Sequence, residues 1–382
     1  MTTPLPVNVS KIKEEIKEVF NYIYANPELS SEESKSSKFL VKKISEFCDV
    51  VQKDYLGMET SFMAKIGNGN PKVCLFAEYD ALPIGHACGH NIIAAWAFGV
   101  FKSLSMEEHL NGTVYIFGSP AEEGRGKYAS SKIKIGKEAK KLGINGSFVI
   151  HPYNTWAVSG QYFARWRNSF IFHGKESHAA GAPNEGINAL DAAVNFYLSC
   201  KMIRSTLDNT YTTVISEIIA DGGKAVNIIP ERAEVIVDVR SSGDAYIESV
   251  TDKILVAAKA SASSNGCTLD IKQLAPVTST FKKNPEMDNI FYKSTKKYVP
   301  NILSLEQAKM LPAIGSSDVG DLSHSIPTSQ LLVGITEDKI GLHTQEFLRI
   351  AGTSQAEESL LYAVASGYDA VKSFLTQFDN HV

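Results

Sequence analysis

Two carboxylates, two imidazoles and a thiol stand within residues 77–91, directly after an apolar run; they are Glu78, Asp80, His86, Cys88 and His90. A soft thiolate and borderline imidazoles are the ligands that Zn²⁺ prefers. Cys88 and His90 are two residues apart, so they converge on one point only from a turn or from the start of a helix. If further ligands arrive from elsewhere, this segment predicts a metal site, and a catalytic one.

A lone Cys-x-His pair is more often a buried cysteine beside a structural histidine. Here the strand-end carboxylates and Gly89, which permits a tight backbone, favour metal binding instead. A bridging thiolate or carboxylate can hold two metal ions at the separation of about 3.5–4 Å that is typical of two-metal hydrolases. For His86, packing or hydrogen bonding at the start of a helix explains the residue at least as well as metal ligation does.

A second cluster, Glu122-Glu123, follows a short apolar strand predicted at residues 114–117. Side chains of adjacent residues diverge, so one carboxylate can bind a metal while its neighbour faces the substrate as a general base. An ordinary acidic loop is the alternative, because pairs of glutamates are common in loops.

Two single histidines complete the candidate ligand set. His151 ends a predicted apolar strand, and His343 stands in a Gly-Leu-His-Thr turn. Each is a weak signal by itself, because a lone histidine in such a place is more often a hydrogen-bonded structural residue. Together with Cys88, His90 and Glu123 they form a set of nitrogen, sulfur and oxygen ligands that suffices for two four- or five-coordinate zinc ions.

The elements that must position these clusters alternate between helices and strands. Helices are predicted at residues 9–24, at about 31–48 after a Ser30-x-x-Glu33 capping box, at 92–104 and at 131–142. Strands are predicted at residues 61–66, 73–78, 114–117 and 148–150. This alternation is typical of an α/β fold with a mostly parallel sheet and helices on both faces. Ligands of such sheets gather outside the carboxyl ends of the strands, where the polar clusters fall.

The pattern changes after about residue 161. Two alternating strands and two helices are predicted there, at residues 162–172, 233–239, 186–203 and 244–262. They indicate a smaller α+β domain, residues 161–275, inserted into a main domain that comprises residues 1–160 and 276–382.

Composition bounds the class of protein. The chain of 382 residues has 44% hydrophobic and 21% charged residues, as expected for a globular protein of two domains. A formal net charge of −4 gives no electrostatic argument for nucleic acid or an anionic membrane as a partner. No apolar run approaches the ~18 residues of a membrane helix, and no signal peptide is expected. The five scattered cysteines form no disulfide framework, so the cytoplasm is the expected compartment.

Several motifs and their order resemble the aminoacylase/carboxypeptidase family of two-metal peptidases. They are Ala-Glu-Tyr-Asp-Ala-Leu-Pro, His-Ala-Cys-Gly-His, Pro-Ala-Glu-Glu-Gly, Ile-His-Pro and a late Leu-His. The similarity covers nearly the whole chain and is closest to the amidohydrolase branch, which includes auxin-conjugate and aminobenzoyl-glutamate hydrolases. The Ala-Glu-Tyr-Asp and Gly-His-Asn variants resemble the aminoacylase-1-like dipeptidase subgroup. The resemblance implies a zinc-peptidase type of main domain and an inserted domain that serves as lid and dimerisation domain.

The resemblance also implies how the five ligands divide between the ions. By this resemblance Cys88 bridges the two ions. His90 and Glu123 would complete one site, and His151 and His343 would complete the other. The expected ions are Zn²⁺, with Mn²⁺ or Co²⁺ as alternatives.

The resemblance also bears on four further residues: two match known roles in the family, and two depart from the family's pattern. Glu122 matches the general base and proton shuttle, and Asp80 matches an acid that orients a metal-bound histidine two residues earlier. Here that earlier position is Glu78, so this residue is expected to contact the metal ligands and not the metal itself. Asn91 stands where many amidohydrolases carry aspartate, so the charge near the cluster is less negative and the metal preference can differ.

The resemblance extends to the inserted domain. His178 matches a lid histidine that reaches the active site of the neighbouring subunit, so a homodimer or higher homo-oligomer is expected. Asn227 and Arg240 match lid positions that bind the oxygens and the carboxylate of the substrate, and Gly315 begins a segment that looks like the substrate-side loop. Without the resemblance, His178 reads as a solvated loop residue and Arg240 as a surface residue in a salt bridge.

These expectations combine into one function. The protein is expected to hydrolyse an amide bond in dipeptides or N-acyl amino acids with a free carboxylate, by a metal-bound water that Glu122 activates. His178 and Asn227 would stabilise the developing oxyanion, and Arg240 would hold the carboxylate. The alternatives are a metal-bound scaffold or binding protein without catalysis and, less well supported, a redox role for Cys88, which has no resolving cysteine nearby.

Overall fold

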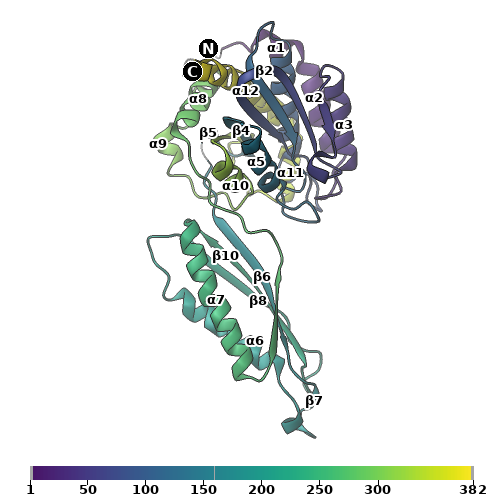
Figure 1. Ribbon diagram of the computed structural model, residues 1–382, viewed down its shortest axis with the longest axis vertical. Helices are drawn as coiled ribbons and strands as arrows, with labels where there is room; N and C mark the ends of the chain where they lie inside the picture. The colour runs from purple at the N-terminus through teal and green to yellow at the C-terminus, as the bar shows by residue number, and fades with distance from the viewer. Residues whose placement is uncertain (1–2, 159, 380–382) are drawn as a thin grey trace. The chain divides into compact units, whose positions relative to one another are not determined.

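The computed structural model describes residues 3–158 and 160–379, and the chain divides into two compact units (Figure 1). The first unit comprises residues 1–161 and 281–382, and the second unit comprises residues 162–280. Each unit has a hydrophobic core of its own. Within the described residues, no helix is both long enough and apolar enough to cross a membrane.

The first unit is built on a six-stranded, mostly parallel sheet, which confirms the predicted fold class. The strand order is β1-β2-β4-β12-β5, with β3 paired to β2. The pairs β2–β3, β2–β4 and β4–β12 are parallel, while the end strands β1 and β5 are antiparallel to their neighbours. The strands are β1 (Val51–Lys53), β2 (Phe62–Ala77), β3 (Asn111–Gly118), β4 (Gly146–Tyr153), β5 (Ala157–Val158) and β12 (Thr328–Gly334).

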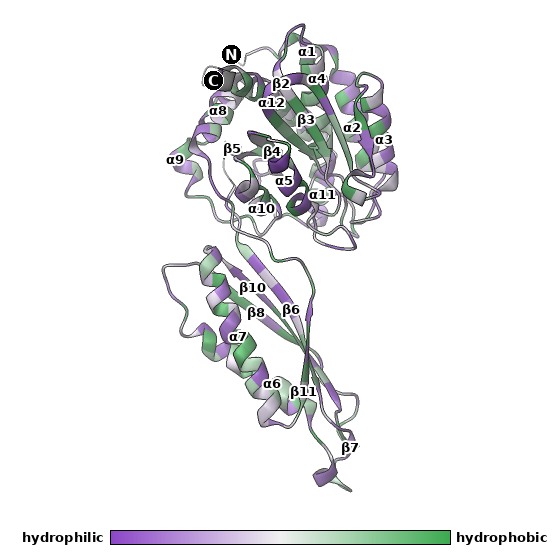
Figure 2. Cartoon of the chain, in the orientation of Figure 1, coloured by the Kyte–Doolittle hydropathy of each residue, from purple (hydrophilic) through white to green (hydrophobic). Residues whose placement is uncertain are grey.

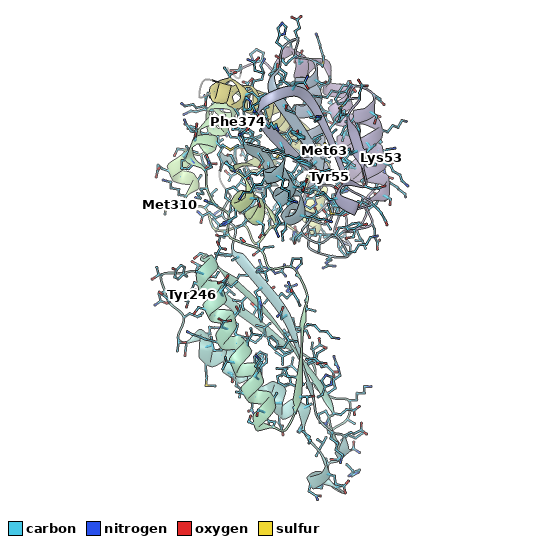
Figure 3. All side chains as sticks on the ribbon, viewed as in Figure 1. Lys53, Tyr55, Met63, Tyr246, Met310 and Phe374 are labelled. Atoms are coloured by element: carbon cyan, nitrogen blue, oxygen red, sulfur yellow. The ribbon has the colours of Figure 1, made fainter. Side chains whose placement is uncertain are left out.

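Both faces of this sheet are covered. Leu75 of β2 belongs to the core that also contains side chains of α4 and α12, and its neighbour Phe76 points to the opposite face. Phe76 is also fully buried and contacts Phe117 of β3. Figure 3 labels Phe374 of α12, which packs edge-on against Phe148 of β4. Figure 2 shows hydrophobic residues concentrated in the strands of this sheet.

The helices of the first unit match the predicted periodic segments and add several more. They are α1 (Val7–Lys11), α2 (Lys13–Ala25), α3 (Ser34–Ser45), the short 3-10 helix η1 (Tyr55–Gly57), α4 (His90–Ser105), α5 (Ser131–Lys141), α8 (Pro285–Lys296), α9 (Leu305–Ala308), α10 (Val319–Ser325), α11 (Gln345–Ile350) and α12 (Ser354–Asp379). Helix α4 is buried on nearly all sides, as expected for a helix that is apolar all round.

The predicted capping box at the start of α3 is wrong. Helix α3 begins at Ser34, and Glu33 occupies the N-cap position without a side-chain capping bond. The Ser30 hydroxyl instead donates to Oδ2 of Asp80, 2.7 Å away and fifty residues further along the chain. A long-range contact has therefore replaced the local one that the pattern suggested.

The second unit contains a four-stranded antiparallel sheet in the order β11-β6-β10-β8, and helices α6 and α7 pack against it. Burial alternates along β10 with the period of two expected for a half-exposed strand. Tyr246 of α7, labelled in Figure 3, stacks on Tyr211 with ring centroids 4.6 Å apart. The elements are β6 (Ala164–His173), β7 (Ser177–His178), the 3-10 helix η2 (Pro183–Glu185), α6 (Ala189–Arg204), β8 (Thr213–Asp221), β9 (Ile228–Ile229), β10 (Arg232–Ser241), α7 (Asp244–Ser264) and β11 (Thr268–Gln273).

Candidate active site

The close approach of a helix start to a strand brings the first candidate ligands together. Helix α4 begins at His90, and β4 contains His151. Between Cys88 and His90 the chain turns at Gly89, whose φ is 78°. A Cβ at Gly89 would lie 2.8 Å from Cγ of Pro152 in β4, so a residue with a side chain would not fit.

Two groups of three side chains share Cys88. Within each group, one ligand atom from every residue lies within 4.8 Å of the others; the groups are Cys88–His90–His151 and Cys88–Glu123–His343. The Cys88 sulfur lies 3.4 Å from Nε2 of His151, and Nε2 of His343 lies 3.5 Å from Oε1 of Glu123. The Cys88 thiol is thus the one side chain that the two groups have in common.

This grouping differs from the expected pairing of His90 with Glu123. The rings of His90 and His151 meet edge-on, with centroids 6.5 Å apart and an interplanar angle of 89°. His343 reaches Glu123 because its backbone adopts a left-handed conformation (φ 64°) and its N–H donates to the carbonyl of Ala87, 2.9 Å away. His86, which was not assigned as a ligand, belongs to neither group.

The residues of both groups fit divalent metal ions. Nε2 of His90 and Oε1 of Glu123 are buried and have no hydrogen-bond partner within the described part of the chain. Buried polar atoms are normally satisfied, so each of these two atoms indicates a cation in its own ligand group. Burial raises the pKa of the Cys88 thiol well above its ordinary value, so its thiolate form requires a cation. Burial lowers the pKa of His151 to about 4, which keeps the imidazole in the neutral form that binds metals.

Asp80 contacts the ring nitrogen of His90 that faces away from the ligand groups. Its Oδ1 lies 3.0 Å from Nδ1 of His90, and its Oδ2 accepts hydrogen bonds from the Ser30 hydroxyl and from the N–H of Glu123. Burial raises the pKa of Asp80, but His90 and these hydrogen bonds outweigh burial and bring the pKa to about 2. A carboxylate on the far nitrogen of a metal-binding imidazole fixes the tautomer and the orientation of the ring.

Glu122 lies beside the ligand groups with an ionised carboxylate. Its Oε1 accepts a hydrogen bond from the Ser317 hydroxyl, and its Oε2 lies 3.7 Å from Nε2 of His90. Burial raises the pKa of Glu122, but the charges of Lys132 and His90 outweigh burial and lower the pKa below its ordinary value. With Oε1 engaged by Ser317, Oε2 is the oxygen that can accept a proton.

A buried ion cluster around Lys132 lies next to Glu122, and the sequence interpretation missed it. The Lys132 side chain is fully buried, and its Nζ lies 2.7 Å from Oδ1 of Asp318 and 3.0 Å from Oε1 of Glu78. Burial lowers the pKa of Lys132, but Asp318, Glu78 and Glu122 raise it well above its ordinary value, so the ammonium is charged. Glu78 also belongs to a third group of possible ligands, with His90 and Glu122.

The second unit brings His178 and Asn227 together. Strand β7 pairs antiparallel with β9, and the N–H of Ala179 donates to the carbonyl of Asn227, 2.9 Å away. Nδ1 of His178 accepts a hydrogen bond from the N–H of Gly181 at 2.9 Å. A ring that accepts at Nδ1 carries its proton on Nε2, which can act as a hydrogen-bond donor.

Arg240 lies near the opposite end of β10. It follows Arg232, the first residue of β10, by eight positions, which is a distance of about 26 Å in an extended strand. Nε of Arg240 lies 3.1 Å from Oδ1 of Asp238, while Arg165 and Arg167 both donate to Oδ2 of Asp238. Three guanidinium groups around one carboxylate give this cluster a net positive charge.

Gly315 belongs to the loop before α10 of the first unit. Two residues further on, Ser317 donates its hydroxyl hydrogen to Glu122, and the next residue, Asp318, contacts Lys132. The loop that was expected to face the substrate is thus attached to the candidate base. Asn91 is buried, and its side-chain amide donates to the carbonyl of Ala351.

The chain is similar to several known proteins. Residues 164–265 match the family model described as a peptidase dimerisation domain. The Xaa-Arg dipeptidase of Mus musculus is 30% identical over 356 residues, which cover 88% of this chain and 80% of that protein. The N-acetyldiaminopimelate deacetylase of Oenococcus oeni is 24% identical over 390 residues, covering 95% of this chain and 97% of that protein.

Two solved structures show the same fold. A dinuclear metal-binding peptidase of the M20 family from Bacillus subtilis superposes with a TM-score of 0.71 at 19% identity, covering 96% of this chain and 99% of that one. An aminobenzoyl-glutamate utilization protein from Klebsiella pneumoniae superposes with a TM-score of 0.69 at 16% identity, covering 95% and 98%. Together with the similarity to the mouse dipeptidase over most of both chains, these findings mean that the chain belongs to the aminoacylase/carboxypeptidase family, the M20 peptidases, and is a hydrolase.

Proposed function

We propose that this protein hydrolyses an amide bond in dipeptides or N-acyl amino acids that carry a free carboxylate. The observation that carries the proposal is that two ligand groups share Cys88 and that the ionised Glu122 lies beside them. One group, Cys88–His90–His151, would hold one divalent ion, and the other, Cys88–Glu123–His343, would hold the second. Zn²⁺ suits these ligands best, with Mn²⁺ or Co²⁺ as alternatives. When bound, the pair of ions supplies Lewis acidity and a water of lowered pKa.

Glu122 is the proton carrier in this proposal. Its carboxylate is ionised and therefore ready to accept a proton. Ser317 holds Oε1, so Oε2 takes the proton from the attacking water and later gives it to the leaving amine. Asp80 keeps the ring of His90 in place during both transfers, because its carboxylate engages Nδ1.

The second unit would supply the groups that recognise the substrate. Nε2–H of His178 and the side-chain amide of Asn227 are suitable donors for a developing oxyanion. Arg240, with Arg165 and Arg167 beside it, lies in a positive field that suits a carboxylate. The relatives that act on Xaa-Arg dipeptides and on an N-acetylated amino acid support this choice of substrate class.

The spacing of these groups supports a homo-oligomer with shared active sites. Arg240 is more than about 20 Å from the β7–β9 pair along β10, whereas a dipeptide spans only about 7 Å. One second unit therefore cannot offer both Arg240 and His178 to the same substrate. We assign His178 and Asn227 to the active site of a partner subunit.

An exposed apolar surface on the second unit supports the same conclusion. Val194, Leu198 and Met202 lie at successive four-residue steps on α6 and are 37%, 50% and 64% exposed. Strand β8 is at the edge of its sheet and exposes Val214 and Ile218. Open strand edges and contiguous apolar surfaces are typical of protein interfaces.

The cysteines bear on the compartment in which the protein works. All five are unpaired, which supports a reducing compartment such as the cytoplasm.

The test combines metal analysis with a substrate panel. Purified protein should contain two divalent ions per chain and release amine from some dipeptides or N-acyl amino acids. Glu122→Gln should retain both ions and lose turnover by at least about a hundredfold, whereas Glu138→Gln on α5 should leave turnover unchanged. Substantial turnover by Glu122→Gln would remove this residue from the role of base. Metal-loaded protein that releases amine from no member of the panel would favour the non-catalytic alternative.

A further inference from the structure

Residues 28–33, which connect α2 to α3, contact the chain segment that follows β2, and we call them the brace segment. The N–H of Ala81 donates to the carbonyl of Glu28 at 2.7 Å, and the Ser30 hydroxyl donates to Oδ2 of Asp80 at 2.7 Å. The brace segment therefore supports the carboxylate that orients His90. Neither contact can be read from the local pattern around Ser30.

The brace segment also contacts the segment that follows β3, which carries Glu122 and Glu123. The Ser31 hydroxyl donates to the carbonyl of Arg125 at 3.1 Å and accepts a hydrogen bond from the N–H of Tyr128 at 2.9 Å. One short connection is thus attached to both segments that supply the candidate ligands and the candidate base.

The last residue of the brace segment, Glu33, makes the contact nearest to the base. Its side chain is fully buried. Oε1 accepts hydrogen bonds from the N–H of Ser31 at 2.7 Å and from the N–H of Ala121 at 2.9 Å, and Oε2 accepts one from the Thr60 hydroxyl at 2.9 Å. Three donors converge on this carboxylate, so its position is fixed from three sides.

Ala121 is the residue directly before Glu122, and its backbone is left-handed. Its φ of 58° lies in a region that residues with a Cβ rarely adopt, so the surroundings must maintain it. The bond from its N–H to Glu33 is one such restraint, and its carbonyl accepts two more bonds, from the N–H groups of Gly124 and Ser130. The orientation of the following peptide determines where the Glu122 side chain points.

We propose that Glu33 is a positioning residue for the catalytic loop, holding the Ala121 peptide so that the Glu122 carboxylate faces the attacking water. This rests on the proposed function of Glu122 as the base. Glu33 itself touches neither the substrate nor the ligand groups, and it acts through one backbone N–H. A displacement of about 1 Å at a catalytic group can cost on the order of a hundredfold in rate, so loss of this bond should be visible in kcat.

The chemistry of the site defines a conservative replacement. In Glu33→Gln the amide oxygen can still accept from Ser31 and Ala121, and the new NH₂ can donate to the Thr60 hydroxyl, which also has acceptor capacity. In Glu33→Leu the volume is similar, but both backbone N–H groups lose their acceptor. Glu32, adjacent in sequence but exposed, offers a matched control.

The experiment measures kcat, KM, metal content and thermal unfolding of the full-length, metal-loaded chain with the best substrate of the panel. Glu33→Leu should keep two ions per chain and a KM within about threefold of wild type, with kcat lowered by about a hundredfold. Glu33→Gln should restore kcat to within about threefold. Glu32→Leu and Glu32→Gln should both match wild type.

Two results would overturn the proposal. The first is a kcat for Glu33→Leu within about threefold of wild type; the second is a loss of kcat that is matched by equal loss of bound metal or folded protein. If Glu33→Leu does not fold, Thr60→Val decides, because it removes one restraint on the carboxylate. A several-fold lower kcat with unchanged KM supports the proposal, and an unchanged kcat rejects it. Glu122→Gln, measured in parallel, separates this failure from that of the proposed function, since an active Glu122→Gln would reject the base itself.

Discussion

Nδ1 of His90 lies 2.8 Å from the carbonyl oxygen and 3.0 Å from Oδ1 of Asp80, which leaves Nε2 as the ring atom without a hydrogen-bond partner in the described residues. Asp80 therefore determines the tautomer of this histidine, and with it which ring nitrogen can bind a metal ion. The carboxylate is held in turn by Ser30 and by the N–H of Glu123.

Replacing Asp80 should weaken metal binding more than it weakens the fold. Asp80→Asn removes the negative charge that fixes the ring, so we expect metal affinity to fall by about 10–100-fold. Competition with a fluorescent chelator measures this affinity. Ser30→Ala, which removes one of the hydrogen bonds to Oδ2, should lower the affinity by less than Asp80→Asn does. Unchanged affinity in Asp80→Asn would exclude the assigned role.

Loss of Lys132 should destabilise the first unit strongly. Lys132→Met would leave the buried carboxylates of Asp318 and Glu78 without their cation, and removal of one partner from a buried ion pair typically costs about 3–5 kcal/mol. Urea unfolding of wild type and variant measures this difference. Lys141, which is 74% exposed, supplies the control, because Lys141→Met should change stability by less than about 0.5 kcal/mol.

A second substitution tests whether uncompensated charge causes the loss of stability in Lys132→Met. Asp318→Asn in the Lys132→Met background removes one of the uncompensated charges, so the double variant should regain part of the lost stability. If the double variant is less stable than Lys132→Met by the full cost of Asp318→Asn alone, the two side chains are not coupled and the ion cluster does not explain the loss.

The free energy of unfolding should depend on pH in part through Asp288. Burial raises the pKa of this carboxyl to about 6, against an ordinary value of 3.8, and its Oδ1 accepts a hydrogen bond from Ser329. The folded state therefore keeps a proton that the unfolded chain has lost. The contribution of Asp288 to stability is fully present below about pH 4 and is lost as the pH rises to about 6.

Asp288→Asn should remove the loss of stability that wild type shows as the pH rises from about 4 to about 6. The amide oxygen can still accept the hydrogen bond from Ser329, while the group no longer ionises. Relative to wild type, the variant should gain up to about 3 kcal/mol at pH 7.5 and little at pH 4, with the change between pH 4 and 6. Urea unfolding across this range at constant metal concentration provides the measurement. A gain that is equal at pH 4 and pH 7.5 would mean that packing, not ionisation, is responsible.

Periodic elements could be predicted from the sequence because their signals are local. The apolar segment that became α4 and the alternation that became β10 are visible in windows of about ten residues. The five candidate ligands are weaker local signals, because no spacing rule links positions so far apart, and the resemblance to a known family connects them. The division of those ligands between two groups depends on contacts between distant segments, and the groups in the structure differ from the expected ones.

Contacts between distant segments could not be predicted in this way. Lys132 is one of several lysines in α5, and nothing in its neighbourhood distinguishes it from the exposed ones. Its partner Asp318 follows 186 positions later, and Glu33 stands 88 positions before Ala121. Such pairs are formed by tertiary packing, so a single sequence contains no pattern that marks them. The false capping box at Ser30 shows the same effect, because the local partner is available and the distant one is used.

Mixing two inactive variants would test the shared active site directly. His178→Ala keeps its own base, and Glu122→Gln keeps its lid histidine, so each homodimer should be inactive. In a mixed dimer, one active site combines Glu122 of one chain with His178 of the partner subunit. Random exchange makes half of the dimers mixed, and half of their sites complete, so activity should recover to about a quarter of the wild-type value.

The apolar surface of α6 provides the control for this recovery. Leu198→Glu in both variants places a charge on a residue that is 50% exposed, so it should disturb an interface but not the fold. Light scattering should then report monomers, and mixing should restore no activity. If the mixture without Leu198→Glu also remains inactive although mixed dimers are demonstrated, His178 acts within its own chain. The separation between Arg240 and the β7–β9 pair would then require a different explanation of how one substrate is held.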